Sequence, residues 1–157
     1  MKEIQLTNGG VTLVDNEDFN ELKKYKWFAH REKSTTYVWR HLNGSRKMVK
    51  IHRQILNAMD SSIKIDHIDG NGLNNQRNNI RLCNDQQNSM NTKIRRDNSS
   101  GYKGVSYHAK NKKWRATINF NRRQISIGCY GNKEDAAVAY NQKAIELFGE
   151  FARPNVI

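Results

Sequence analysis

The segment DHIDGNGLNNQRNNIRLCNDQQNSMN, residues 66–91, decides the fold of the first half of this 157-residue chain. Two short apolar stretches, within residues 63–67 and 80–82, lie on either side of a loop rich in Gly and Asn. Asn84 is a favourable N-cap for a helix over residues 85–91. The pattern therefore predicts a unit made of a strand, a loop, a second strand and a helix.

The residue types in this unit point to a metal and an acid–base group. Asp66 and Asn88 carry oxygen donors, which favour magnesium or manganese over zinc. His67 has an ordinary pKa of about 6.5, so its neutral imidazole can take a proton from water. Hydrolysis of a phosphodiester needs both parts. Asn84 or Asn91 could serve in place of Asn88, and the sequence leaves this open.

The loop has two other interpretations. An isolated Asn- and Gly-rich run is usually only a turn, and it is the complete set of residues that favours a functional site here. A calcium-binding EF-hand is excluded, because Leu73 and Asn74 occupy the fifth and sixth places of the loop and Ile80 replaces the final Glu.

Residues 66–91 resemble the ββα-metal motif of HNH endonucleases, especially homing endonucleases of phage and intron origin, which share the Asp-His-Ile-Asp-Gly-Asn run. The resemblance implies that His67 is the general base and that Asp66 and Asn88 are metal ligands, with Mg²⁺ or Mn²⁺ as the cofactor. It also implies that Asn79 fixes the loop between the two strands.

This sequence departs from the family pattern at one position, and it resembles the family at a second place upstream of the motif. The third signature position is Asn88 rather than His, which makes the site H-N-N. Upstream, His52 and Arg53 resemble a His-Arg pair of the family, for which a phosphate contact is implied.

The remainder of the first half predicts a β-rich scaffold. Turns at Asn8–Gly10 and at Asn43–Gly44 separate short strands, and residues 15–25 predict one short helix. A second helix is expected over residues 52–58, with Ile55, Leu56 and Met59 facing a core.

A polar and basic stretch, residues 91–101, separates the two halves of the chain and is typical of a linker. We place the boundary near Arg95. The predicted organisation is a nuclease domain over residues 1–92, a basic linker over residues 93–100 and a second domain over residues 101–157.

The second domain shows alternation with a period of two, which is typical of half-buried strands. We expect a three-stranded antiparallel sheet packed on one helix, which begins at an Asn132 cap and ends at Gly149. A tight turn is expected near Asn121-Arg122. The residues predicted to face the helix or the core are Val105, Tyr107, Trp114, Ala116, Ile118, Phe120, Ile125, Ile127, Cys129 and Tyr140.

Residues 101–155 resemble the DNA-binding domain of plant ethylene-response (APETALA-type) transcription factors. The resemblance rests on Gly101-Tyr102-Lys103-Gly104-Val105, Trp114-Arg115-Ala116, Ile127-Gly128-Cys129-Tyr130 and Glu134 to Tyr140. It implies a sheet that reads the major groove of double-stranded DNA. Several contact positions lack the Arg or Trp of the plant factors, so the target sequence is not given. The candidate DNA-binding residues are Lys103, Ser106, His108, Arg115, Thr117, Asn119, Arg122, Gln124 and Ser126.

Charge supports nucleic acid as the partner. The chain has 27 Lys and Arg against 15 Asp and Glu, a net charge of +12, and residues 93–157 carry +8 of it (13 basic, 5 acidic). Two distant cysteines, which we expect to be reduced and buried, exclude a Cys-x-x-Cys zinc ribbon. No signal peptide or membrane span is evident, so a cytoplasmic protein is expected, in a host cell if phage- or intron-encoded.

The sequence thus predicts a two-domain α+β protein that cleaves a specific DNA site, with no membrane partner and no small-molecule cofactor. We expect a monomer that nicks one strand, with a dimer as the alternative. The rival functions are a catalytically silent DNA-binding transcriptional regulator and an RNA-binding protein. The second is weaker, because the sheet face lacks exposed aromatic residues for base stacking.

Overall fold

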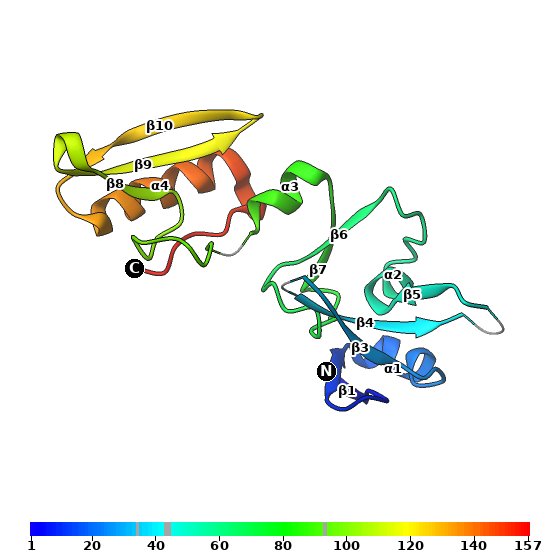
Figure 1. The fold of residues 1–157 in the computed structure, drawn as a ribbon. Coiled ribbons are helices and arrows are strands. Elements are labelled where there is room, and N and C mark those ends of the chain that lie inside the picture. The colour runs from blue at the N-terminus through cyan, green and yellow to red at the C-terminus, as the bar shows by residue number, and fades with distance from the viewer. Residues whose placement is uncertain (34, 43–44, 93) are drawn as a thin grey trace. The chain divides into compact units, whose positions relative to one another are not determined.

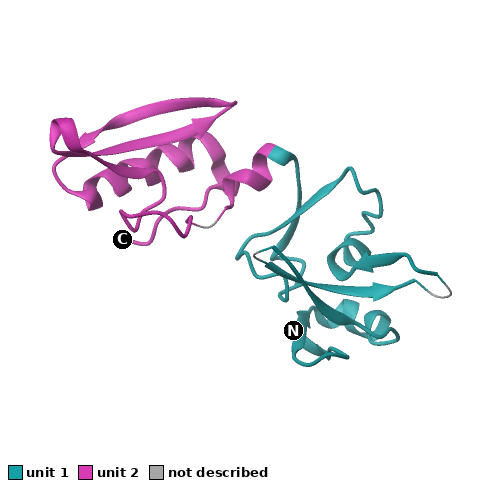
Figure 2. Ribbon diagram, in the orientation of Figure 1, with its two compact units in different colours: residues 1–85 teal, residues 86–157 magenta. Residues whose placement is uncertain are grey.

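The computed structural model describes residues 1–33, 35–42, 45–92 and 94–157, and the expected Asn43–Gly44 turn lies outside them. The chain is α+β, with small antiparallel sheets and a few helices (Figure 1). It divides into two compact units, Met1–Asp85 and Gln86–Ile157 (Figure 2), and each unit has a hydrophobic core of its own.

The first unit is built from short strands, as its turn-rich sequence predicts. Its antiparallel sheets have the orders β1-β2, β3-β4-β5 and β6-β7. Gly9 and Gly10 form the first predicted turn, with φ values of 94° and 80° that favour glycine. The elements are β1 (Lys2–Gln5), β2 (Val11–Val14), α1 (Asn16–Leu22), β3 (Phe28–Glu32), β4 (Thr35–His41), β5 (Met48–Lys50), α2 (Ile51–Ile55), β6 (Lys64–His67) and β7 (Ile80–Cys83).

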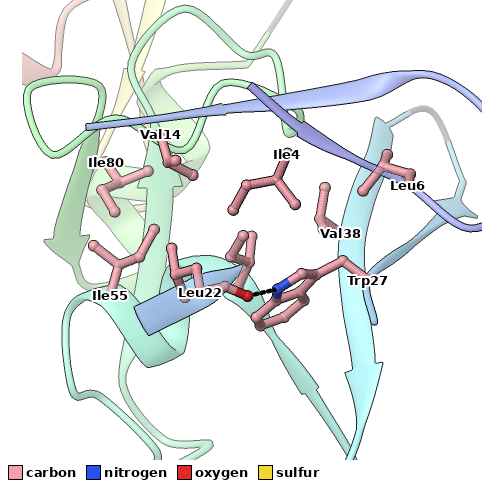
Figure 3. Close-up of a cluster of buried hydrophobic side chains, with 9 residues drawn as sticks. Ile4, Leu6, Val14, Leu22, Trp27, Val38, Ile55 and Ile80 are labelled. Carbon is pink, nitrogen blue, oxygen red and sulfur yellow. Dashed lines mark hydrogen bonds between the residues drawn. The ribbon is translucent and has the colours of Figure 1, made fainter. Parts of the chain in front are cut away.

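The core of this unit surrounds Trp27, which is fully buried (Figure 3). The indole Nε1 donates to the carbonyl of Leu22 at 2.8 Å, which satisfies the one polar group of the ring. Met59 is not part of this core, although its expected helix face had implied that it would be: it is 54% exposed, because α2 ends at Ile55 and Met59 lies in the following loop.

The loop between β6 and β7 is attached to the same core through β2. The Leu13 backbone donates to Leu73 O at 2.9 Å, and Asn75 N donates to Leu13 O at 2.8 Å. Because both bonds are made by backbone groups of β2, the amide-rich loop has a fixed position relative to the strands on either side of it.

The second unit contains the predicted three strands and helix. Its sheet has the order β10-β9-β8, and α4 packs against it. Asn121 and Arg122 form the expected turn, with φ values of 51° and 62° as a two-residue hairpin turn requires. The Asn132 side chain caps α4 by accepting from Asp135 N at 2.7 Å. The elements are α3 (Asp85–Met90, which begins at the last residue of the first unit), β8 (Val105–His108), η1 (Ala109–Asn111), β9 (Lys113–Phe120), β10 (Arg123–Tyr130), α4 (Lys133–Phe148) and η2 (Gly149–Phe151).

Two inward predictions in this sheet are wrong. A bulge between Ser126 and Gly128 reverses the alternation of β10, so Cys129 is exposed rather than buried. Tyr107 contacts the Trp114 ring, with centroids 5.2 Å apart, but is 53% exposed. Cys83 is only partly buried, and both cysteines are free thiols.

The segment before β8 is bonded into the second unit. Ser100 is buried, and its hydroxyl donates to Val105 O at 2.8 Å. The Asn98 side chain accepts from Gly101 N at 2.8 Å and donates to Tyr102 O at 3.0 Å. The division between the units falls after Asp85, whereas polar composition suggested a boundary near Arg95. The polar side chains here bond to backbone groups of their own unit.

Gly104→Ala is expected to destabilise the second unit by roughly 2–5 kcal/mol, because it adds left-handed backbone strain to an overlap of atoms. Gly104 has φ of 76°, and a Cβ there would overlap the Tyr140 ring and lie 2.6 Å from the Thr117 carbonyl oxygen. Thermal unfolding followed by circular dichroism measures the effect.

Gly101→Ala is the matched control for this substitution. Gly101 has φ of 80°, and no atom lies within 4 Å of the place that a Cβ would take, so only the backbone strain of roughly 1–2 kcal/mol is expected. Equal effects of the two substitutions would show that the Tyr140 ring yields and that packing at Gly104 is not tight.

Candidate functional site

His67, at the end of β6, is held by a chain of polar groups that fixes its tautomer. Asn75 is fully buried, and its Nδ2 donates to Thr12 Oγ1 at 2.9 Å and to Gly72 O at 3.1 Å. The Thr12 hydroxyl in turn donates to Leu73 O at 2.8 Å. The Asn75 Oδ1 therefore faces His67 Nε2, 3.1 Å away. Since this oxygen only accepts, Nε2 carries the proton and Nδ1 is the basic nitrogen of the neutral ring.

The surroundings of His67 favour its neutral form. Burial lowers its pKa below the usual value, and the hydrogen bond to Asn75 and the charges of Asp69 and Asp66 oppose the shift without cancelling it. A neutral imidazole at neutral pH is able to accept a proton, and the two carboxylates stabilise the cation that results.

Two further rings enclose the imidazole. The His52 ring lies 5.1 Å from that of His67 between centroids, and the Tyr37 ring lies 5.8 Å from both. Burial, followed by the charges of His67, Lys50 and Arg53, lowers the pKa of His52 to about 2, so this ring is neutral. Its buried Nδ1 has no hydrogen-bond partner within the described ranges. His52 thus lies beside His67 as a packed, uncharged ring.

Asp66 is buried on β6 and is paired with a cation on the neighbouring strand. Arg81 is its register partner on β7, and Arg81 Nη2 lies 3.0 Å from Asp66 Oδ2. Both side chains are largely withdrawn from solvent. This buried pair holds the carboxylate next to His67 in the chain and at the same end of the strand.

Asn79 joins the two ends of the loop between β6 and β7. Its Nδ2 donates to Asp69 Oδ1 at 3.0 Å and to Asn74 O at 2.8 Å, while its Oδ1 accepts from Asp69 N at 3.1 Å. Burial raises the pKa of Asp69, but hydrogen bonds from Asn71 N, Asn74 and Asn79 outweigh it and leave the pKa lowered. The loop is therefore closed around an ionised carboxylate.

Arg53 lies outside this network, and Asn88 belongs to the other unit. The Arg53 guanidinium donates to the carbonyls of Ala58, Asp60 and Ile63, each at 2.8 Å, and so holds the loop that follows α2. Asn88 lies on α3, in the second unit. The first unit by itself therefore brings together Asp66, His67 and Asn79 with His52.

The donors of the site suit a hard cation. Among the described residues, no three His, Cys, Asp or Glu side chains are grouped so that they could hold a metal ion. Within the first unit, Asp66 offers a carboxylate, and Mg²⁺ commonly binds one or two carboxylates and completes its shell with water and phosphate oxygens. A carboxylate donor fits Mg²⁺ or Mn²⁺ better than zinc.

In the second unit, the register of the sheet gathers most of the candidate DNA-binding residues on one face. Ser106 lies opposite Arg115, Thr117 opposite Ser126, and Asn119 opposite Gln124. His108 is opposite Lys113 on the same face, Arg122 lies in the exposed turn, and the bulge adds Cys129 beside Arg115.

Lys103 differs from the other candidates of this unit. Its Nζ donates to Met90 O at 2.7 Å and to Thr92 O at 3.0 Å, at the end of α3. Burial and then the charge of Arg153 lower the pKa of Lys103 to about 8. Its ammonium is thus directed at backbone carbonyls.

Sequence reasoning missed the residues that orient His67 and Asp66. Asn75 is one of many amides in its loop, and Thr12 lies 63 positions before it, so neither stands out. Arg81 could have been found, since a cation directly opposite Asp66 in a predicted pair of strands is a natural ion-pair partner.

Comparisons with known proteins match both halves of the chain. An uncharacterised HNH endonuclease of Acanthamoeba polyphaga mimivirus is 37% identical over 154 residues, which cover 95% of this chain and 76% of that protein. Protein 3.8 of Escherichia phage T7 is 33% identical over 131 residues, 83% of this chain and 97% of that protein.

The second unit has relatives of its own. The AP2 domain family matches residues 100–150. An ethylene-responsive transcription factor of Arabidopsis thaliana is 40% identical over 58 residues, 36% of this chain and 14% of that protein. No solved structure matches, and no helix among the described residues is long and apolar enough to cross a membrane. The similarity over nearly the whole chain shows that this protein belongs to the HNH endonuclease family, with an AP2 domain in its C-terminal part.

Proposed function

We propose that this protein is a site-specific, metal-dependent DNA endonuclease of the homing type. The observation that supports it most is the orientation of His67: Asn75 and Thr12 fix a buried, neutral imidazole with Nδ1 as its basic nitrogen. Any buried histidine needs a hydrogen-bond partner, and a general base needs in addition one ring nitrogen without a proton, which the bond from Nε2 to Asn75 leaves at Nδ1.

In the proposed reaction, His67 takes a proton from the attacking water at Nδ1. Asn75 keeps the ring in one orientation, and Asp66 and Asp69 stabilise the imidazolium. Asn79 holds the loop that carries Asp69. A Mg²⁺ or Mn²⁺ ion held by Asp66 and Asn88 would stabilise negative charge on the scissile phosphate and on the leaving oxygen. The products would be a 5′-phosphate and a 3′-hydroxyl.

The AP2 domain would supply the choice of site. Its sheet presents a face of hydroxyls, amides and cations, a set that suits base edges and phosphates in the major groove. A chain with one such active site would nick a single strand as a monomer, and a double-strand break would need two binding events or a dimer.

The alternative function is a DNA-binding regulator without catalysis, which the likeness to plant transcription factors favours. The presence of Asp66, His67 and Asn79 together argues against it, because DNA binding alone needs no such combination of a carboxylate, an imidazole and an amide that closes the loop. Supercoiled plasmid with Mg²⁺ separates the two: nicked circles support the nuclease, while gel retardation of intact plasmid supports the regulator.

Cys129 gives a prediction for the sheet face. It is exposed and lies opposite Arg115, so DNA bound on this face should slow its modification by a maleimide. The measurement is the labelling rate by mass spectrometry in a Cys83→Ser background, with and without saturating duplex. Protection should disappear at high salt, where phosphate contacts weaken. Undiminished labelling in a saturated complex would place DNA on another surface.

A further inference from the structure

Helix α3, which carries Asn88, is attached at both ends to the second unit. At its start, Gln86 Nε2 donates to Asn121 Oδ1 at 2.6 Å, in the turn between β9 and β10. At its end, Lys103 Nζ donates to the carbonyls of Met90 and Thr92. These contacts lie within one compact unit, so residues 86–90 of α3 are part of the body that contains the AP2 domain.

A helix as short as α3 (six residues) is marginal by itself and leaves its last carbonyls without partners. A cation at the carbonyl end satisfies them and interacts favourably with the helix dipole. Arg153 adds a longer contact there, with Nη1 3.4 Å from Asn91 O. Lys103 makes two shorter bonds at this end, to Met90 O at 2.7 Å and to Thr92 O at 3.0 Å.

The backbone of Lys103 is held in place by the side chain of Asn155. The Lys103 backbone donates to Asn155 Oδ1 at 2.6 Å and accepts from Asn155 Nδ2 at 3.1 Å. Asn155 is bonded in turn to Asn141 on α4, through Asn155 N to Asn141 Oδ1 at 2.6 Å. A continuous series of hydrogen bonds therefore runs from α4 to Lys103 and from there to α3.

We propose that Lys103 is a positioning residue of the nuclease, which holds the carbonyl end of α3 and so determines where Asn88 stands. This inference rests on the proposed function, in which Asn88 is a metal ligand. It gives Lys103 a role other than the DNA contact expected from the sequence.

The test is Lys103→Met in the full chain, with DNA affinity and single-turnover cleavage measured over a range of Mg²⁺ concentrations. We expect unchanged affinity and salt dependence, and a Mg²⁺ requirement raised by roughly 10–100-fold, as is typical when support of a metal ligand is lost. Lys103→Arg should restore most of the activity, because a guanidinium can also donate to both carbonyls. Lys110→Met, at an exposed lysine on η1, is the control and should leave the Mg²⁺ requirement unchanged.

Each other outcome counts against the inference. A fall in affinity with a salt slope reduced by about 0.9 would make Lys103 a phosphate contact. An unchanged Mg²⁺ requirement would show that Lys103 does not position Asn88. If Lys103→Met does not fold, Gln86→Leu removes the bond at the other end of α3, and it must raise the Mg²⁺ requirement or the inference fails. Failure of the wild type to cleave would instead overturn the proposed function.

Discussion

Replacing His67 by alanine is expected to slow DNA cleavage by about 10²- to 10⁴-fold, the range that general acid–base catalysis contributes. DNA affinity should be almost unchanged, because a general base acts on the transition state and not on the bound duplex. Single-turnover cleavage of a plasmid and gel retardation of a duplex measure the two quantities separately.

The network around His67 provides graded variants for this experiment. Asn75→Ala removes the acceptor that fixes the ring, so it should lower the cleavage rate less than loss of His67 itself. His41→Ala is the control, because His41 is an exposed histidine on β4. Loss of binding in parallel with loss of cleavage in His67→Ala would mean that His67 supports the fold or the DNA interface and is not the base.

Removal of divalent cations is expected to abolish cleavage and to leave DNA binding by the AP2 domain intact. Mg²⁺ or Mn²⁺ should restore activity, since a carboxylate and an amide suit hard cations, and zinc should restore less. Full activity in EDTA would exclude the proposed cofactor.

The Asp66→Asn substitution tests the same metal site by changing a proposed ligand and leaving the cation in solution unchanged. It keeps the size of the side chain and removes the charge, so a higher Mg²⁺ concentration should be needed for half-maximal cleavage. The substitution also leaves Arg81 without its buried ionic partner, which is costly. Thermal unfolding must therefore be measured alongside. A normal Mg²⁺ requirement in a folded variant would remove Asp66 from the ligands.

The sequence was informative wherever a local pattern controls the structure. Alternation predicted β9, and Asn132 and Gly149 marked the ends of α4, because capping and pleating depend on neighbouring residues. The closure of the loop by Asn79 followed from resemblance to a known motif, and the hydrogen bonds of Asn79 to Asp69 and Asn74 have the geometry that such closure needs.

Contacts between distant residues were out of reach of the same reasoning. Nothing local in β10 indicates its bulge, which reverses the side of the sheet that Cys129 occupies. The bond from Asn75 to Thr12 joins two segments 63 residues apart. The positive charge of Lys103 suggests a DNA contact, and only the folded structure shows that its ammonium donates to carbonyls at the end of α3.

The border between the two units has a consequence for how such proteins exchange their parts. It lies after Asp85, so β7 falls on one side and residues 86–90 of α3 on the other. Recombination within residues 93–100 would separate α3 from Lys103 and Arg153 and leave the new combination without matching partners. A crossover at Asn84 would transfer the helix together with its supports. Lineages that acquire new target sites by module exchange should therefore carry crossovers just after β7, inside the catalytic motif and not in the polar segment that follows it.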